Sequence, residues 1–172
     1  NGCRLGNLKF DNFKKFIDEN DFESIELSNH GEVFLNPELD KIIEYATTKG
    51  IALSMDNGVN LNYLSDKMAE TLVKCGVKRV YVSIDGASQE TYKIYRKNGD
   101  FNKVIENIKK INFYKQKYNS KYPVMYYKFI VFGHNEHEIE QAKILAKNLD
   151  MEIVFEQNPY PDFSPVKNPQ KV

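Results

Sequence analysis

The chain has 172 residues, with 24 basic and 24 acidic side chains, so its net charge is near zero. This length suits one domain, and a chain of this size buries about 70% of its unfolded surface on folding. A balanced charge argues against a nucleic-acid partner, which requires a clustered basic excess. Apolar runs stay well below the roughly 20 residues of a membrane-spanning helix, so no membrane partner is expected either.

The two cysteines, Cys3 and Cys75, are too few for a disulfide framework. A reducing, cytoplasmic location is therefore expected. The sequence begins at Asn1 rather than methionine, and no signal-peptide pattern follows. We interpret the chain as an internal piece of a longer protein.

Four short runs of β-forming residues recur along the chain, and a glycine closes each. The runs cover residues 24–28, 51–55, 80–84 and 127–132, and the glycines are Gly31, Gly58, Gly86 and Gly133. A fifth run covers residues 152–156. Segments between the runs place apolar residues at helical spacing, as in the stripe of Leu39, Ile42, Ile43 and Ala46.

Alternating strands and helices are typical of parallel α/β sheets. The 27-residue spacing from Gly31 to Gly58 suits one unit of a (β/α) barrel. Five strands are too few for a closed, eight-stranded barrel. We therefore predict a partial, TIM-like (β/α) barrel of about five parallel strands in sequence order.

Several residues mark where the predicted helices begin and end. Asn36-Pro37 is typical of an N-cap followed by proline, and Asn135-x-x-Glu138 resembles a capping box. Gly50 and Gly76 are expected to end helices in a left-handed conformation. A further helix over residues 13–18 precedes the first strand.

The last 14 residues differ from the rest of the chain. They contain four of the six prolines and little helical pattern. The sequence thus predicts a core over residues 1–158 and a proline-rich tail or linker over residues 159–172, leading toward a C-terminal extension.

Small polar and acidic side chains follow the first three strands. Because crossovers between parallel strands are right-handed, these strand ends should lie at the same edge of the sheet. Glu32 can pair with an ammonium group, and Ser83 and Asp85 can bind hydroxyls. Arg96 can bind a carboxylate with two hydrogen bonds. The alternative is that the Asp-Gly and Asn-Gly pairs are only turns.

These segments resemble radical S-adenosylmethionine (SAM) enzymes over about residues 8–158. The run 26–32 with 35–39 is similar to their Gly-Gly-Glu segment, and 56–58 to their Thr-Asn-Gly. Residues 82–87, with 91–92, 95–96, 99–101 and 106–108, resemble the subgroup with a SPASM or twitch extension. The segment 132–139 matches the region after the fifth strand of that subgroup.

The resemblance implies that the parent protein uses SAM and a [4Fe-4S] cluster to form a 5'-deoxyadenosyl radical, which abstracts hydrogen from a substrate. An electron donor would be a partner, and the substrate would be a peptide, a protein side chain or a small molecule. The implied SAM contacts are Gly31 and Glu32 at the ammonium, Ser83 and Asp85 at the ribose or methionine end, Arg96 at the carboxylate, and Asn57 and Gly58 beside the adenosine.

Two departures from the family pattern stand out. His30 replaces the first glycine of the Gly-Gly-Glu segment. The Cys-x3-Cys-x2-Cys cluster motif is incomplete, with Cys3 a candidate for its third ligand. One thiolate cannot hold a cubane cluster, so the fragment alone is expected to be inactive. A non-catalytic barrel that binds no cluster therefore remains an alternative, and an unrelated phosphate-binding barrel enzyme ranks last.

Other candidate sites favour structural roles. His134 and His137 suggest zinc, but no third or fourth ligand is evident. Cys75 is expected to act as a small buried hydrophobe. The aromatic and lysine-rich stretch 113–127 suits a solvated helix surface better than an RNA platform.

The period of the strands leads to one geometric prediction. Glu32, Asn57 and Ser83 should lie at equivalent strand ends, with Arg96 folded back over the same edge. Since neighbouring strands are about 4.8 Å apart, these groups should lie within about 15 Å of one another around one cavity.

Overall fold

A computed structural model describes residues 6–160 and 162–167 of the chain. Its strands are β1 (Ser24–Glu26), β2 (Ala52–Val59), β3 (Arg79–Ser83), β4 (Val124–Val131) and β5 (Glu152–Gln157). Its α-helices are α1 (Phe10–Asp18), α2 (Leu39–Thr48), α3 (Asp66–Lys74), α4 (Gln89–Tyr95), α5 (Phe101–Lys117) and α6 (Ile139–Asn148). Three short 3-10 turns are η1 (Val33–Leu35), η2 (Leu61–Tyr63) and η3 (Glu136–Glu138).

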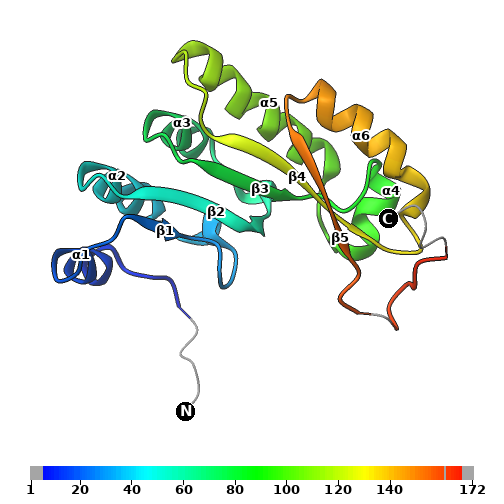
Figure 1. The fold of residues 1–172 in the computed structure, drawn as a ribbon, viewed down its shortest axis with the longest axis horizontal. Coiled ribbons are helices and arrows are strands. Elements are labelled where there is room, and N and C mark those ends of the chain that lie inside the picture. Colours follow the sequence, from blue (N-terminus) through cyan, green and yellow to red (C-terminus); the bar gives the residue numbers. More distant parts are fainter. Residues whose placement is uncertain (1–5, 161, 168–172) are drawn as a thin grey trace.

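The strands form one parallel sheet in the order β1-β2-β3-β4-β5, as Figure 1 shows. The predicted partial barrel of five parallel strands in sequence order is confirmed. The pairing of β2 with β3 shifts register between Met55 and Val59, where β2 bulges. This bulge lies at the carboxyl end of β2, where the candidate site begins.

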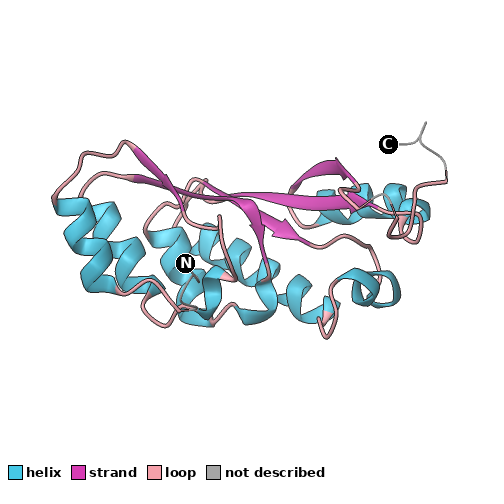
Figure 2. Ribbon diagram, turned by 90° about the horizontal axis from the view of Figure 1, so that it is seen from below, coloured by secondary structure: helices cyan, strands magenta, loops and turns pink. Residues whose placement is uncertain are grey.

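The helices lie on one face of the sheet (Figure 2). Alternate strand residues point into the core beneath that face, such as Leu53 and Met55 of β2 and Val80 and Val82 of β3. The residues between them face the opposite side and are mostly polar. One face of the sheet therefore carries mostly polar side chains and is not covered by helices of the described chain.

The predicted helix boundaries hold in part. Gly50 and Gly76 follow α2 and α3 with positive φ angles of 76° and 63°, as predicted. Asn36 does not cap α2, because the helix begins at Leu39 with Glu38 as its N-cap. The Asn36 side chain instead accepts a hydrogen bond from the Glu38 amide two residues later, at 3.0 Å, which forms a turn before the helix.

The predicted capping box at Asn135 and Glu138 is wrong. Neither side chain caps the helix that follows it. Asn135 points back into the sheet edge, and its amide donates to the carbonyls of Asp85 and Ile130 at 2.9 Å each. Glu138 crosses to the loop after β3, as described below.

Residues 162–167 pack against the loop after β4. The Gly133 amide donates to the Ser164 carbonyl at 2.7 Å, and Phe163 contacts the rings of Tyr95, Phe132 and His134. A side chain at position 133 would collide with the Pro165 carbonyl. This part of the predicted tail therefore lies on the core. Helices long and apolar enough to cross a membrane do not occur among the residues that the structure describes.

Candidate functional site

Glu32 lies in the loop after β1, and its two carboxylate oxygens have different surroundings. Its Oε2 atom accepts a hydrogen bond from the Asn60 amide at 3.2 Å. Its Oε1 atom is buried and has no hydrogen-bond partner among the described residues. A cavity of about 170 Å³ adjoins it, lined in part by His30, Gly31 and Leu27. A buried, unpaired carboxylate oxygen beside a cavity is a natural partner for a cation.

Burial raises the pKa of the Glu32 carboxyl group. Backbone amides of Asn60 and Phe34 oppose this shift, and so does the positive charge of Arg96. The positive charge of Arg96 is the smallest of these opposing effects.

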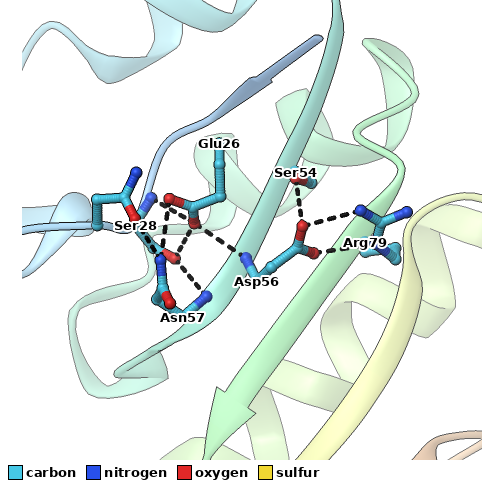
Figure 3. Close-up of polar contacts among 7 residues, drawn as sticks. Glu26, Ser28, Ser54, Asp56, Asn57 and Arg79 are labelled. Carbon is cyan, nitrogen blue, oxygen red and sulfur yellow. Dashed lines mark hydrogen bonds and ion pairs between the residues drawn. The ribbon is translucent and has the colours of Figure 1, made fainter.

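Asn57 lies on the bulge of β2 and turns toward the end of β1 (Figure 3). Its side-chain amide donates to Glu26 at 3.2 Å and also to Asn29. Its backbone amide donates to the Ser28 hydroxyl at 3.1 Å. Asn57 is therefore at the predicted strand end, but its side-chain amide group is engaged by β1 and the loop after it.

Glu26 organises this end of the sheet, although it was not predicted to. Its Oε1 atom accepts from the Ser28 amide at 2.8 Å and from the Asp56 amide at 3.0 Å (Figure 3). Asp56 in turn binds Arg79 through two hydrogen bonds, of 3.0 and 2.8 Å. The only indication of this role in the sequence is the alternation of polar and apolar residues along the strands. Such alternation is typical of a sheet with one face not covered by helices.

Gly58 and Ser83 meet where β2 and β3 end. A Cβ atom at position 58 would collide with the Ser83 hydroxyl and would lie 3.3 Å from Cδ of Lys128. The φ angle of Gly58 is +104°, a conformation that side chains disfavour. Only glycine therefore allows this close approach, and the two predicted residues are neighbours.

Lys128 is a further residue that the sequence analysis missed. It pairs with Ser83 in the register of β3 and β4, and its side chain is largely buried. Its ammonium donates to the Asn57 carbonyl at 3.2 Å and forms an ion pair with Glu156 at 2.9 Å. It therefore ties β2, β4 and β5 together across the uncovered face.

Asp85 and Arg96 form a buried ion pair. The Arg96 Nε and Nη2 atoms lie 2.7 and 2.5 Å from Oδ2 of Asp85. The other carboxylate oxygen accepts from the Ile130 amide at 2.7 Å. Burial raises the pKa of Asp85, against the opposing effects of Arg96 and the Ile130 amide. Arg96 does fold back over the strand edge, as predicted, but it does so onto Asp85.

The loop after β3 is held by the loop after β4. The Glu138 carboxylate accepts from the Ala87 amide and the Ser88 hydroxyl, both at 2.6 Å, and also from the Thr91 hydroxyl. Burial alone would raise the pKa of Glu138, but these hydrogen bonds lower it. Glu138 therefore fixes the start of α4, the helix that leads to Arg96.

The structure thus brings Gly58 beside Ser83 and joins Asp85 to Arg96, whereas Arg96 has only a minor electrostatic effect on Glu32. The cavity beside Glu32 is lined by Gly31 and Glu32, whereas Asn57, Ser83 and Arg96 do not line it.

Of the two candidate metal sites, only the one at His134 and His137 lies within the described residues. Cys3 lies outside the described residues. Within residues 6–160 and 162–167, no group of three side chains suits a metal ion. His134 packs instead between Phe132 and Phe163, with its Nδ1 atom 2.8 Å from the Ser164 hydroxyl.

Comparison with known proteins decides the family. Residues 12–146 match the Radical SAM superfamily. The chain belongs to this superfamily. It is 32% identical over 126 residues to GTP 3',8-cyclase of Clostridium botulinum, a match that covers 73% of this chain and 37% of that protein. It is 34% identical over 93 residues to AdoMet-dependent heme synthase of Methanosarcina barkeri, with 53% and 26% covered.

Solved structures agree with the radical SAM fold. The structure of anSMEcpe with bound AdoMet and the Cp18Cys peptide matches with a TM-score of 0.65 at 15% identity, covering 92% of this chain and 46% of that one. Streptococcus suis SuiB matches with a TM-score of 0.64 at 11% identity, with 84% and 31% covered. The chain therefore spans between a quarter and about a half of the length of these radical SAM relatives.

The residues present fit one of the two groups that the superfamily uses. The unpaired Oε1 atom of Glu32 suits the ammonium of SAM. The cluster does not fit the described part of the chain. It needs three or four thiolates, and the one cysteine described, Cys75, lies half-buried at the end of α3, where burial raises its pKa.

Proposed function

We propose that this chain is the SAM-binding part of a radical SAM enzyme. The observation that supports the proposal most directly is the buried, unpaired Oε1 atom of Glu32. An isolated carboxylate oxygen without a partner is costly, and an incoming ammonium would satisfy it with a charge-assisted hydrogen bond. Membership of the superfamily makes the methionine ammonium of SAM the natural candidate.

The other predicted residues support the same assignment. Arg96 offers a cation near Glu32 for the carboxylate of SAM, so an amino acid would meet opposite charges at its two groups. Gly58 and Ser83 are close neighbours at the ends of β2 and β3, because the missing side chain at position 58 lets the Ser83 hydroxyl approach the β2 backbone. In our proposal, the adenosine side lies near Asn57 and Gly58, and Ser83 serves the ribose or the methionine end.

A bound [4Fe-4S] cluster would supply the electron for cleavage of SAM to the 5'-deoxyadenosyl radical. The described residues do not hold it, so their own contribution is to bind and orient SAM. The substrate, the electron donor and a SPASM or twitch extension stay predictions from the resemblance.

The alternative is a non-catalytic barrel that binds no cluster. His30 favours it, because this bulky ring replaces a glycine of the family segment and lines the cavity beside Glu32. A full-length protein that takes up no cluster on anaerobic reconstitution, with no absorbance near 400 nm, would support this alternative.

The test is the affinity of SAM for wild-type protein and for Glu32→Gln, measured by calorimetric titration of the reconstituted full-length protein. Loss of the carboxylate charge should weaken binding by about 10- to 100-fold, because a hydrogen bond to a charged group contributes about 1.5–3 kcal/mol. Cluster content should not change.

Glu38→Gln is the matched control, since Glu38 lies six residues further along the chain. Its Oε2 atom accepts from the Phe10 amide at 3.3 Å and does not line the cavity. Equal SAM affinities for wild type and Glu32→Gln would contradict the site, and a wild type that binds no SAM would contradict the function.

A further inference from the structure

Both oxygens of the Asp85 carboxylate bind other residues of the chain. Its side chain is 0% exposed, one oxygen binds Arg96, and the other binds the Ile130 amide. The resemblance implied that Asp85 faces SAM. In the structure, Asp85 lies behind Arg96, whose side chain is 26% exposed.

We propose that Asp85 is a positioning residue, which holds the Arg96 guanidinium toward the carboxylate of SAM without touching SAM itself. The inference rests on the proposed function. A guanidinium carries five N–H donors in a rigid fork. Asp85 occupies the Nε edge through Oδ2 and so fixes the plane and rotation of the fork. Among the described residues no other acceptor binds this guanidinium, so its remaining donors stay available for a ligand.

Other contacts restrain both partners of this ion pair. Asp85 adopts a positive φ of 53°, and Asn135 binds its carbonyl at 2.9 Å, so its backbone is held as well as its side chain. Arg96 Cζ also lies 4.9 Å from the centre of the Tyr95 ring. Tyr95 packs in turn on Phe132, with ring centres 4.6 Å apart.

Such restraint affects binding because a free arginine side chain must lose rotational freedom when it binds a ligand. Asp85 and Tyr95 remove that loss before SAM arrives. The effect should therefore be confined to ligands that carry a carboxylate. This selectivity separates positioning from a general loosening of the fold.

Asp85→Asn is the variant of choice. Asparagine tolerates a positive φ, and its side-chain oxygen can still accept from the Ile130 amide. The amide nitrogen that replaces Oδ2 would face the Arg96 donors, so the fork would lose its anchor. The backbone should remain as it is, which thermal unfolding of the variant would verify.

The experiment titrates SAM and decarboxylated SAM, which lacks only the carboxylate, into the reconstituted full-length protein. Asp85→Asn should weaken SAM binding by about tenfold. It should change the affinity for decarboxylated SAM by less than twofold. Glu140→Gln, which breaks the exposed pair with Lys143 on α6, should leave both affinities within twofold of wild type.

If Asp85→Asn does not fold, Tyr95→Leu replaces it. Loss of the ring should weaken SAM binding by about threefold, through the lost contact between the ring and the guanidinium, and spare the decarboxylated ligand. Equal losses for the two ligands, or no loss for SAM, would overturn the positioning role. A wild type that binds neither ligand would overturn the proposed function itself.

Discussion

Two aspartate–arginine pairs differ in their surroundings, and the two aspartates shift their pKa values in opposite directions. One pair joins β2 to β3, and the other joins the loop after β3 to the end of α4. Asp56 and Arg79 are 31% and 49% exposed, and Arg79 lowers the pKa of Asp56. Asp85 and Arg96 are 0% and 26% exposed, and burial raises the pKa of Asp85 despite its partner. Both aspartates bind an arginine through two nitrogens. Burial, rather than the bond itself, decides which way the carboxyl group shifts.

The two pairs are expected to differ in how much they contribute to stability. A solvated pair adds little, because water competes for both charges. A buried pair is costly to form and more costly to break, because the surviving charge lies away from water. The exposed pair therefore contributes modestly to the sheet, whereas the buried pair, in our proposal, holds the Arg96 side chain in place for binding.

Removing the arginine from each pair should give the largest contrast. Arg96→Gln should lower the free energy of unfolding by about 2–4 kcal/mol, because it leaves the Asp85 carboxylate buried without its counter-charge. Arg79→Gln should lower it by less than about 1 kcal/mol. Urea unfolding of the purified proteins measures both, and equal losses would show that burial does not separate the pairs.

Disturbing the support of the buried pair, without touching the pair, should have a smaller effect. Glu138→Gln replaces one acceptor oxygen by a donor that faces the Ala87 amide or the Ser88 hydroxyl. The expected loss is about 1–3 kcal/mol of stability. Glu140→Gln, at an exposed pair with Lys143, should cost less than about 0.5 kcal/mol in the same urea titration.

Acid should act on the two aspartates with opposite signs. Asp56 has a lowered folded pKa, so its contribution is present above the unfolded pKa and is lost as pH falls through the folded value. Asp85 has a raised folded pKa. As pH falls through that value, protonation relieves the buried charge, and its contribution to stability rises.

Unfolding free energies measured from pH 7 down to about pH 3 would reveal this difference. Asp56→Asn should make the decline in stability shallower than in wild type, and Asp85→Asn should make it steeper. The change that Asp56→Asn causes in the unfolding free energy is expected to be below about 1 kcal/mol. Slopes that change in the same direction would contradict the assignment of opposite pKa shifts.

The sequence was sufficient for the fold because the glycine period and the apolar stripes are local signals. It was also sufficient to place Ser83 at the end of β3 and Glu32 in the loop after β1. It could not show that Asp85 turns inward, because that depends on Arg96 folding back across 11 residues and on the Ile130 amide from β4.

Long-range pairing explains the other differences. Glu138 looks like part of a capping box locally, yet its partners lie about 50 residues earlier, at the start of α4. The role of Glu26 depends on the bulge of β2, which only the assembled sheet reveals. Residues whose partners come from neighbouring strands are therefore the ones that a single sequence describes least well.

The position of Phe163, in contact with the rings of Tyr95, Phe132 and His134, suits a fluorescent reporter residue. The chain has no tryptophan, so a single one at position 163 would be the sole indole emitter. Phe163 touches Tyr95, whose ring also lies against Arg96 (4.9 Å from ring centre to Cζ). Light emitted from that position would report on the surroundings of the guanidinium, without any label added to the site itself.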